Sequence, residues 1–278
     1  MSENVINPVC LDEDNKYLPI GQGNTAEILE YSDTRILKLF REEIPREAAE
    51  HEWQCATAVQ EKFADAPRAY KFVEYKGRCG IIYERIYGTD MINIALTQPL
   101  KLKEYGEVLA DIHLKMHEIN IQLPDDLHSK LTRDINNGTG LTEEEKQKVI
   151  TLLEQLPKKF FLCHFDYHPG NVMVTEDKYY VIDWMTACAG DPAADVARFV
   201  LLMTLGEPLY ADSAKRMLIS AGMNKIKKSY LEKYLFESGF EYEDIEEWLV
   251  PVAAARLSER LTDHERENLI QLVRDGIC

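Results

Sequence analysis

The first 85 residues alternate short runs that favour β-strands with residues that favour turns. These runs read YLPIGQGNTAEILEY, TRILKLF, RAYKFVEY and CGIIYERI. Between the second and third runs, IPREAAEHEWQCATAVQEKF begins with Pro45, a residue favoured in a first helical turn, and continues with helix formers. Its apolar residues include Trp53, Ala56 and Val59. The pattern predicts an antiparallel sheet that one helix interrupts.

After YGTDM the hydrophobic pattern changes its period. In KLKEYGEVLADIHLKMHEI the apolar positions follow the helical repeat of 3.6 residues. These positions are Leu102, Tyr105, Leu109, Ile112 and Met116. Thr142 precedes Glu145 by three residues, which predicts a capping box, and helical patterns resume at Asp191. We therefore predict an α+β fold of two lobes, residues 1–87 and 88–278, with a hinge at their junction.

Composition narrows the class of partner. The 278 residues include 48 acidic and 32 basic side chains, a formal net charge of −16, so we expect neither a nucleic-acid nor a membrane partner. No apolar run reaches 18 residues and the start MSENVINPVC lacks signal-peptide features, which predicts a soluble cytoplasmic protein. The cysteines form no CxxC pair, which predicts reduced thiols and no zinc site. They are Cys10, Cys55, Cys79, Cys163, Cys188 and Cys278.

The segment HFDYHPGNVMV at residues 164–174, followed by YVIDW, gathers polar side chains beside an apolar strand. Asp183 closes that strand and Asn171 offers a neutral oxygen, and oxygen ligands are those that Mg²⁺ prefers. Asp166 lies five residues before Asn171, where it can orient a hydroxyl group and accept its proton. His164 is expected to brace the loop. For any one of these residues taken alone, a loop-capping polar group is the alternative.

The segment GQGNTAEI lies between two predicted strands and is the candidate phosphate-binding turn. Its residues Gly21 and Gly23 have no Cβ, so backbone N–H groups can approach phosphate oxygens, with Asn24 and Thr25 completing the turn. A plain hairpin turn is the alternative interpretation.

Lys38 lies among apolar residues in RILKLF, where an unpaired ammonium group is costly. We therefore expect it to pair with a triphosphate and with a carboxylate of the neighbouring helix. Glu52 is our choice for that carboxylate. Glu47 and Glu50 remain alternatives, because the sequence does not fix the rotation of the helix.

Taken in order, GQG, Lys38, the helix with Glu52, HFDYHPGN and IDW resemble the eukaryotic-type protein kinase fold. HFDYHPGN, IDW and GDPAADVA together are similar to the aminoglycoside phosphotransferase and choline kinase-like family. The resemblance spans about residues 17–205. It implies a two-lobed protein-kinase-like fold, with a nucleotide-binding sheet lobe and a helical lobe for catalysis and substrate.

The resemblance also implies roles for single residues. Asp166 would be the catalytic base, and Asn171 and Asp183 would be the Mg²⁺ ligands. Lys38 would contact the α- and β-phosphates, and Glu52 would hold Lys38 in place.

Three further residues receive roles from the same resemblance. Asp195 would brace the catalytic loop, and the backbone of Glu84 and Ile86 would meet the nucleotide base. The sequence departs from the protein kinase pattern at Ala26, where a third glycine is expected, and at Trp184, where DFG has Phe. Both departures also occur in the phosphotransferase relatives.

The spacing after IDW separates two kinds of kinase. Only seven residues lie between Asp183 and Asp191, which leaves no room for an activation segment and a peptide-binding platform. We therefore predict a small-molecule kinase that transfers the γ-phosphoryl of ATP or GTP to a hydroxyl group. A protein kinase and a non-catalytic nucleotide-binding pseudoenzyme are the alternatives.

The stretch FESGFEYEDIEEWLV carries six acidic side chains that would attract ammonium groups. An aminoglycoside is therefore the leading acceptor, ahead of choline-like and neutral metabolites, and a solvated acidic helix is the alternative. Phe240, Tyr242 and Trp248 could form an apolar wall for the acceptor or belong to the core. His168 could contact phosphate or cap its own loop.

Overall fold

The fold is described by a computed structural model that covers residues 6–206 and 213–277, so Cys278 and the start MSENV lie outside the described residues. The chain forms two compact units, Met1–Thr89 with Val172–Thr186, and Asp90–Asn171 with Ala187–Cys278. This division differs from the predicted lobes in the segment Val172–Thr186, which packs with the first unit. The assignment of nucleotide and substrate binding to separate lobes stays a prediction.

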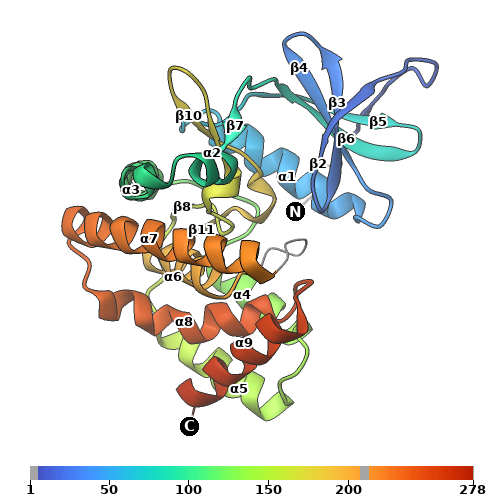
Figure 1. Ribbon diagram of the computed structural model, residues 1–278. Helices are drawn as coiled ribbons and strands as arrows, with labels where there is room; N and C mark the ends of the chain where they lie inside the picture. The colour runs from blue at the N-terminus through green and yellow to red at the C-terminus, as the bar shows by residue number, and fades with distance from the viewer. Residues whose placement is uncertain (1–5, 207–212, 278) are drawn as a thin grey trace. The chain divides into compact units, whose positions relative to one another are not determined.

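The first unit is built on a six-stranded sheet of order β1-β5-β6-β4-β3-β2, of which Figure 1 labels β2 to β6. β1 runs parallel to β5, and all other neighbours are antiparallel. The strands are β1 (Val9–Cys10), β2 (Leu18–Gln22), β3 (Ala26–Ser32), β4 (Arg35–Phe40), β5 (Ala69–Tyr75) and β6 (Arg78–Glu84). The antiparallel sheet predicted from the four runs is confirmed, and β1 is an addition that the sequence pattern did not indicate.

Helix α1 (Arg46–Val59) lies against one face of this sheet, as Figure 1 shows. Its apolar residues recur on one side, so Ala56 joins Phe40 and Ile81 of the strands in a buried core. On the opposite face, Tyr17 from the segment before β2 packs on a second apolar cluster. The sheet is therefore apolar on both faces, and polar residues inside it need specific partners.

The later segment of the first unit forms β9 (Val172–Val174), β10 (Tyr179–Val181) and the 3₁₀ turn η3 (Trp184–Thr186). The Trp184 ring meets Phe63 edge-on with ring centroids 5.9 Å apart. The Trp184 Nε1–H donates to the Val181 carbonyl oxygen at 3.1 Å. These contacts fix the turn that carries Asp183.

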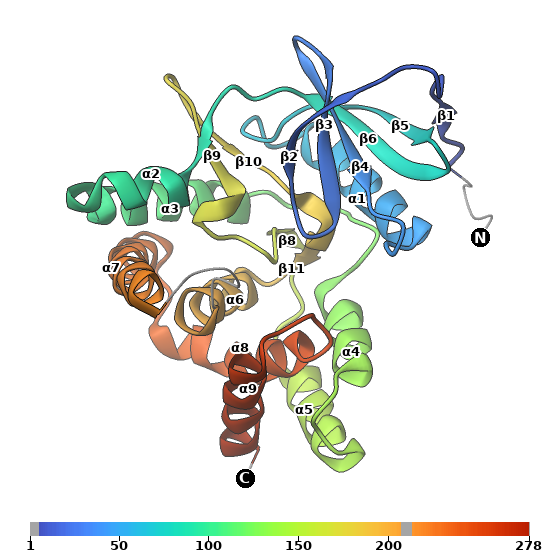
Figure 2. The ribbon, with the colours of Figure 1, turned by 45° about the vertical axis from the view of Figure 1, so that its right-hand side comes forward.

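The second unit is mostly helical (Figure 2). Its helix α3 packs against α7, and α8 packs against α4, α6 and α9. Its elements, after β7 (Thr89–Asp90), are α2 (Met91–Thr97), η1 (Pro99–Lys101), α3 (Leu102–His117), α4 (Leu127–Asn137), α5 (Glu143–Gln155), β8 (Phe161–Cys163), η2 (Pro169–Asn171), β11 (Cys188–Gly190), α6 (Pro192–Leu205), α7 (Ser213–Ser238), α8 (Tyr242–Arg256) and α9 (Asp263–Gly276).

Side-chain caps define where several of these helices begin. At α5 the Thr142 hydroxyl accepts the Glu145 N–H at 3.2 Å, and the Glu145 carboxylate accepts the Thr142 N–H at 2.7 Å. The predicted capping box is thus confirmed. At α6 the Asp191 carboxylate accepts the Ala193 N–H at 3.0 Å, with Pro192 in the first turn.

No helix among the described residues is long and apolar enough to cross a membrane. Within the described ranges no disulfide links the cysteines Cys10, Cys55, Cys79, Cys163 and Cys188, and Cys278 lies outside these ranges.

Candidate functional site

A buried ion cluster lies on the α1 side of the sheet in the first unit. Lys38 on β4 directs its Nζ to both carboxylate oxygens of Glu52 on α1, at 2.7 and 2.8 Å, and to Asp183 Oδ1 at 2.8 Å. The Tyr83 hydroxyl donates to Glu52 Oε1 at 2.9 Å. Of the three glutamates considered from the sequence, Glu52 is the one that contacts Lys38, whereas Glu50 pairs with Arg46. The structure thus brings together three of the predicted site residues.

The cluster keeps Lys38 charged. Burial acts to lower the pKa of Lys38, but the carboxylates of Asp183 and Glu52 outweigh burial and raise this pKa above its ordinary value. Asp183 has a φ of 68°, in the left-handed region that is unfavourable for a residue with a side chain. The surrounding contacts therefore hold its carboxylate at Lys38 against a backbone cost of about 1–3 kcal/mol.

The predicted phosphate-binding turn is the hairpin between β2 and β3. The Gly23 N–H donates to the Ala26 carbonyl oxygen at 2.8 Å. A Cβ at Gly21 would come no closer than 3.6 Å to Ile28, and one at Gly23 would come no closer than 3.8 Å to any group. Packing within the fold therefore does not require glycine at either position. Asn24 is exposed beside these glycines, and the Thr25 carbonyl accepts the Arg41 N–H at 2.9 Å.

The proposed base-binding backbone follows β6. The Glu84 N–H already donates to the Arg68 carbonyl oxygen at 2.8 Å, and the Glu84 carboxylate accepts the Arg68 N–H at 3.2 Å. Ile86 lies two residues later and is half-buried. The Glu84 N–H is thus used by the fold, so its carbonyl oxygen and the Ile86 backbone are the groups that a base could meet.

In the second unit the loop after β8 carries Asp166 and Asn171. The Asn171 Nδ2 donates to the Asp166 carbonyl oxygen at 2.8 Å and to Asp166 Oδ2 at 3.2 Å. The amide nitrogen of Asn171 therefore faces Asp166, and the amide oxygen takes no part in these two contacts. The His164 ring accepts the Asp166 N–H at 3.2 Å, so this buried histidine braces the loop.

The arginine that faces Asp166 was not among the predicted site residues. Arg198 on α6 places Nη2 3.7 Å from Asp166 Oδ1, and its Nη1 donates to Glu259 Oε1 at 2.6 Å. Arg198 is buried, with an exposed fraction of 4%. Its position three residues after Asp195 puts both on one side of α6, which is a signal available in the sequence. Glu259 lies beyond α8, and its place in the sequence did not indicate that it would contact Arg198.

Asp195 holds the backbone of this loop. Its Oδ2 accepts the His164 N–H at 2.7 Å, and its Oδ1 accepts the Phe165 N–H at 2.9 Å. It is fully buried and also faces His113 and His117 of α3. Burial acts to raise the pKa of Asp195, but the two histidines outweigh burial and hold this pKa well below its ordinary value.

Replacing Asp195 with Asn is expected to lower the free energy of unfolding by about 3 kcal/mol. The amide has no charge, and its NH₂ group would face N–H groups that need an acceptor. The lowered pKa of Asp195 means that its stabilisation is present above the unfolded pKa of about 3.9 and is lost as pH falls through the folded value. In urea unfolding, the difference in free energy of unfolding between the unmodified protein and Asp195→Asn should stay constant between pH 5 and 8. A difference that vanishes inside this window, or that also occurs for exposed Asp275→Asn, would contradict the assignment.

His168 caps its own loop. Its Nδ1 accepts the Gly170 N–H at 3.0 Å, and its Nε2 lies 3.9 Å from Asp166 Oδ2. The loop-capping interpretation is therefore realised in the structure. The hydrogen bond at Nδ1 favours the tautomer with hydrogen on Nε2.

The acidic stretch and its aromatic residues separate in the structure. Trp248 is buried and meets His128 edge-on, with ring centroids 5.6 Å apart, so it belongs to the core. Phe240 and Tyr242 are half-buried. The acidic side chains of the stretch are all exposed, namely Glu237, Glu241, Glu243, Asp244, Glu246 and Glu247.

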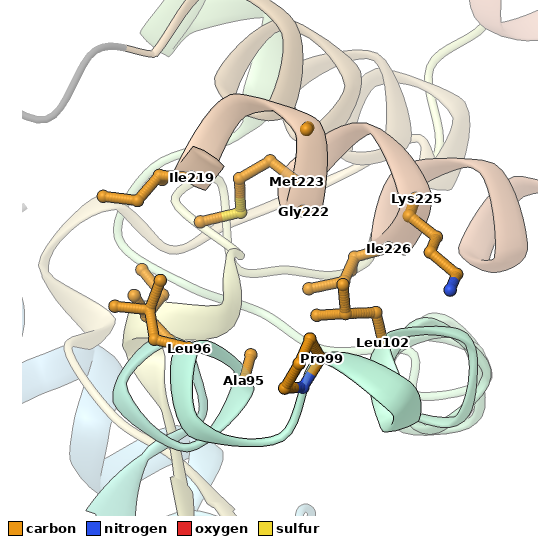
Figure 3. A pocket seen from close by; sticks show the side chains of 11 residues that line it. Ala95, Leu96, Pro99, Leu102, Ile219, Gly222, Met223, Lys225 and Ile226 are labelled. Carbon is orange, nitrogen blue, oxygen red and sulfur yellow. The ribbon is translucent and has the colours of Figure 1, made fainter. Parts of the chain in front are cut away.

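A cavity of about 320 Å³ lies in the second unit between α2 and α7 (Figure 3). Its lining is apolar, with Leu96, Met223 and Ile226 among the contributing side chains and Lys225 as the charged residue. Such a lining does not suit a molecule with several ammonium groups.

A sequence model of the phosphotransferase enzyme family matches residues 16–227. Among curated proteins, none matches this chain by sequence. The solved structures that are similar to this chain include the following three, all at low sequence identity. Choline kinase from Cryptosporidium parvum Iowa II has 12% identity and a TM-score of 0.57, with 94% of this chain and 91% of that chain covered.

Aminoglycoside phosphotransferase APH(3'')-Id from Streptomyces rimosus, in complex with ADP and streptomycin, has 16% identity and a TM-score of 0.56, with coverage of 88% and 93%. A choline/ethanolamine kinase family protein from Mesorhizobium loti has 13% identity and a TM-score of 0.51, with coverage of 95% and 88%. These similarities confirm the predicted kinase-like fold. Since the family model spans more than half of the sequence, the chain belongs to the phosphotransferase enzyme family.

Proposed function

We propose that this protein transfers the γ-phosphoryl group of ATP or GTP to a hydroxyl group of a small acceptor molecule. The observation that carries the proposal is the ammonium group of Lys38, which is buried and held by Glu52 and Asp183. A desolvated cation in a fixed position neutralises phosphate charge far better than a solvated one. The two structural relatives solved with ADP or named as choline kinase support the same class of chemistry.

The nucleotide would be held by the first unit. Lys38 contacts the α- and β-phosphates, and Glu52 fixes the lysine in that orientation. Gly21 and Gly23 leave room for phosphate oxygens to approach the backbone of the β2–β3 turn. The backbone at Glu84 and Ile86 meets the edge of the base. Residues 1–87 would thus form the nucleotide-binding lobe, and residues 88–278 would bind the acceptor.

The donor atoms of Asp183 and Asn171 suit Mg²⁺. Carboxylate and amide oxygens are ligands that this ion prefers, and the Asn171 nitrogen is already engaged with Asp166. When bound, the ion would neutralise the charge that develops on the phosphates. Asp183 and Asn171 would be the residues that hold it.

Asp166 would orient the acceptor hydroxyl and accept its proton. Two contacts fix its carboxylate: the Asn171 Nδ2 at 3.2 Å and the Arg198 Nη2 at 3.7 Å. Both are donors, so they orient the carboxylate without competing for the proton that it accepts. Phosphoryl transfer depends mainly on positioning and charge neutralisation, which is what these contacts provide.

The chain after Asp183 supports a small acceptor over a protein substrate. The turn η3, strand β11 and the Asp191 cap of α6 use the whole stretch between residues 184 and 191. A loop that could bind an extended peptide is not part of this stretch. A small molecule is therefore the proposed acceptor.

We expect a cationic acceptor, with an aminoglycoside first, because exposed carboxylates surround the start of α8. Glu246→Gln combined with Glu247→Gln should raise the KM for such an acceptor about 3- to 10-fold and leave kcat unchanged. The KM of the unmodified protein should also rise with salt, as the Debye length falls from about 10 Å at 0.1 M to about 3 Å at 1 M.

The matched control is Glu143→Gln with Glu144→Gln, which removes two exposed charges at the start of α5. Its KM should equal that of the unmodified protein. Equal KM values for both double variants, or a KM that ignores salt, would show that the acidic residues of α8 serve solubility alone.

The experiment that tests the function is a screen of the purified protein for Mg²⁺-dependent release of ADP or GDP. Acceptors would include aminoglycosides, macrolides, choline and amino sugars, each with ATP and with GTP. We expect release that depends on one class of acceptor, with a phosphorylated product found by mass spectrometry. Nucleotide binding without product from any acceptor would instead favour a non-catalytic nucleotide-binding protein.

A further inference from the structure

Two histidines of α3 lie one helical turn apart and face the same carboxylate oxygen. The Nε2 atoms of His113 and His117 lie 3.0 and 3.3 Å from Asp195 Oδ2. The other ring nitrogen of each meets a tyrosine hydroxyl of α7 at 2.6 Å, Tyr230 for His113 and Tyr234 for His117. All five side chains are buried. Two parallel chains of polar contacts thus run from α7 through α3 to Asp195.

The contacts fix where the protons lie. Asp195 is held ionised by its donors and accepts hydrogen bonds only, so each facing Nε2 carries a hydrogen. Burial and, to a lesser degree, the nearby His117 lower the pKa of His113 to about 3, so that His113 is neutral near pH 7. Its Nδ1 is then an acceptor, and the Tyr230 hydroxyl must donate to it. The same geometry gives Tyr234 the same role toward His117.

Asp195 in turn holds the backbone just before Asp166. Phe165 has a φ of 60°, a left-handed conformation that is rare for a residue with a side chain. Its N–H and the preceding N–H of His164 both donate to Asp195. Strained backbone of this kind persists only where the surrounding structure over-determines it. The carboxylate of Asp195 provides that constraint.

We propose that Tyr230 and Tyr234 are positioning residues for phosphoryl transfer, acting through His113 and His117 on Asp195. Each tyrosine fixes the tautomer and ring orientation of its histidine, and the histidines keep Asp195 oriented toward the loop. Helix α7 thereby sets the backbone that presents Asp166. The inference rests on the proposed role of Asp166 as the base.

A metal ion is the competing explanation for the same cluster. One ligand atom from each of His113, His117 and Asp195 lies within 4.8 Å of the other two. A metal bound at Nε2 would require lone pairs there and would move both hydrogens to Nδ1. The positioning role requires hydrogen on Nε2 of both rings. The two explanations therefore predict opposite tautomers.

The first test measures those tautomers by ¹⁵N NMR of the full-length protein labelled at histidine, with and without added Zn²⁺. We expect hydrogen on Nε2 of both rings, with no change on addition of Zn²⁺. Variants Tyr230→Phe and Tyr234→Phe assign each signal by its shift. Hydrogen on Nδ1, or a shift of both rings with Zn²⁺, would overturn the proposal. The measurement needs no acceptor, so its outcome is independent of the proposed function.

The second test compares kinetics of the Tyr230→Phe and Tyr234→Phe variants, which keep the aromatic packing and remove one buried hydroxyl group. We expect kcat to fall about tenfold in each, about 1.4 kcal/mol, with an unchanged KM for the nucleotide. Tyr105→Phe on α3 is the matched control, because it also removes a hydroxyl that donates to a side chain, Gln98, at 3.0 Å. Its kcat should be unchanged.

Equal kcat values for the Tyr230, Tyr234 and Tyr105 variants would overturn the positioning role. This result is distinguishable from failure of the proposed function, in which the unmodified protein forms no phosphorylated product, and from failure of the role of Asp166, in which Asp166→Asn is fully active. A parallel loss of activity and of thermal stability to the same degree in all three variants would also count against a specific role.

Discussion

Asp183→Asn is expected to abolish phosphoryl transfer while leaving the fold intact. The substitution exchanges a carboxylate for an amide of nearly the same shape, so the ligand charge that Mg²⁺ requires is lost. Lys38 keeps both hydrogen bonds to Glu52, at 2.7 and 2.8 Å, so the buried ammonium group does not become unpaired. Product formation would be followed with the acceptor found in the screen, and the fold would be followed by thermal unfolding.

The matched control is Asp177→Asn in the turn between β9 and β10. Asp177 is an exposed aspartate on the same hairpin, and the change in charge is identical. We expect full activity for this variant. Retained turnover in Asp183→Asn, at saturating Mg²⁺, would remove Asp183 from the metal site.

The helices and strands could be predicted because the spacing of apolar residues along the chain follows the local backbone geometry. The strands of the first unit alternate over short runs, and α1 carries apolar residues at helical spacing after Pro45. Strand β1 was missed because Val9–Cys10 is too short to show a period and is defined only by its pairing with β5. Its existence is a tertiary property.

The partner of Lys38 shows the limit of sequence for a site. Glu47, Glu50 and Glu52 all lie on α1, and propensity treats them alike. Which one reaches β4 depends on how the helix is rotated against the sheet. Packing of Ala56 against the strands sets that rotation, and Glu52 is the glutamate that becomes buried.

Polar contacts between distant segments were the least predictable part. The helical pattern of α3 identified its apolar positions but gave no reason to single out His113 and His117. Their role depends on Tyr230 and Tyr234, which are 117 residues further along the chain in each pair. Likewise Arg198 gains meaning only when the fold places it beside Asp166. Family motifs mark the loop, whereas its supporting contacts are specific to the packing.

Asp166→Asn is expected to lower kcat by about 10²- to 10⁴-fold, the range for loss of a general base, with little change in the KM for the nucleotide. An amide can still accept a hydrogen bond from the acceptor hydroxyl but cannot take its proton. Asparagine has the same size as Asp166, and its one remaining oxygen can keep one of the contacts that Asp166 makes with Asn171 and Arg198. Steady-state kinetics at saturating nucleotide and acceptor would measure the effect.

Asp125→Asn is the matched control, because Asp125 is also a partly exposed aspartate that faces an arginine, Arg133, at 2.7 Å. This variant should keep its kcat, since the pair of Asp125 and Arg133 is a surface ion pair, which contributes little. If Asp166→Asn lost nucleotide affinity and kept its kcat, Asp166 would act in binding, and the base would have to be sought elsewhere. If both variants lost activity equally, the loss would reflect weakened packing of the second unit. Loss of a general base predicts instead that kcat falls in Asp166→Asn alone.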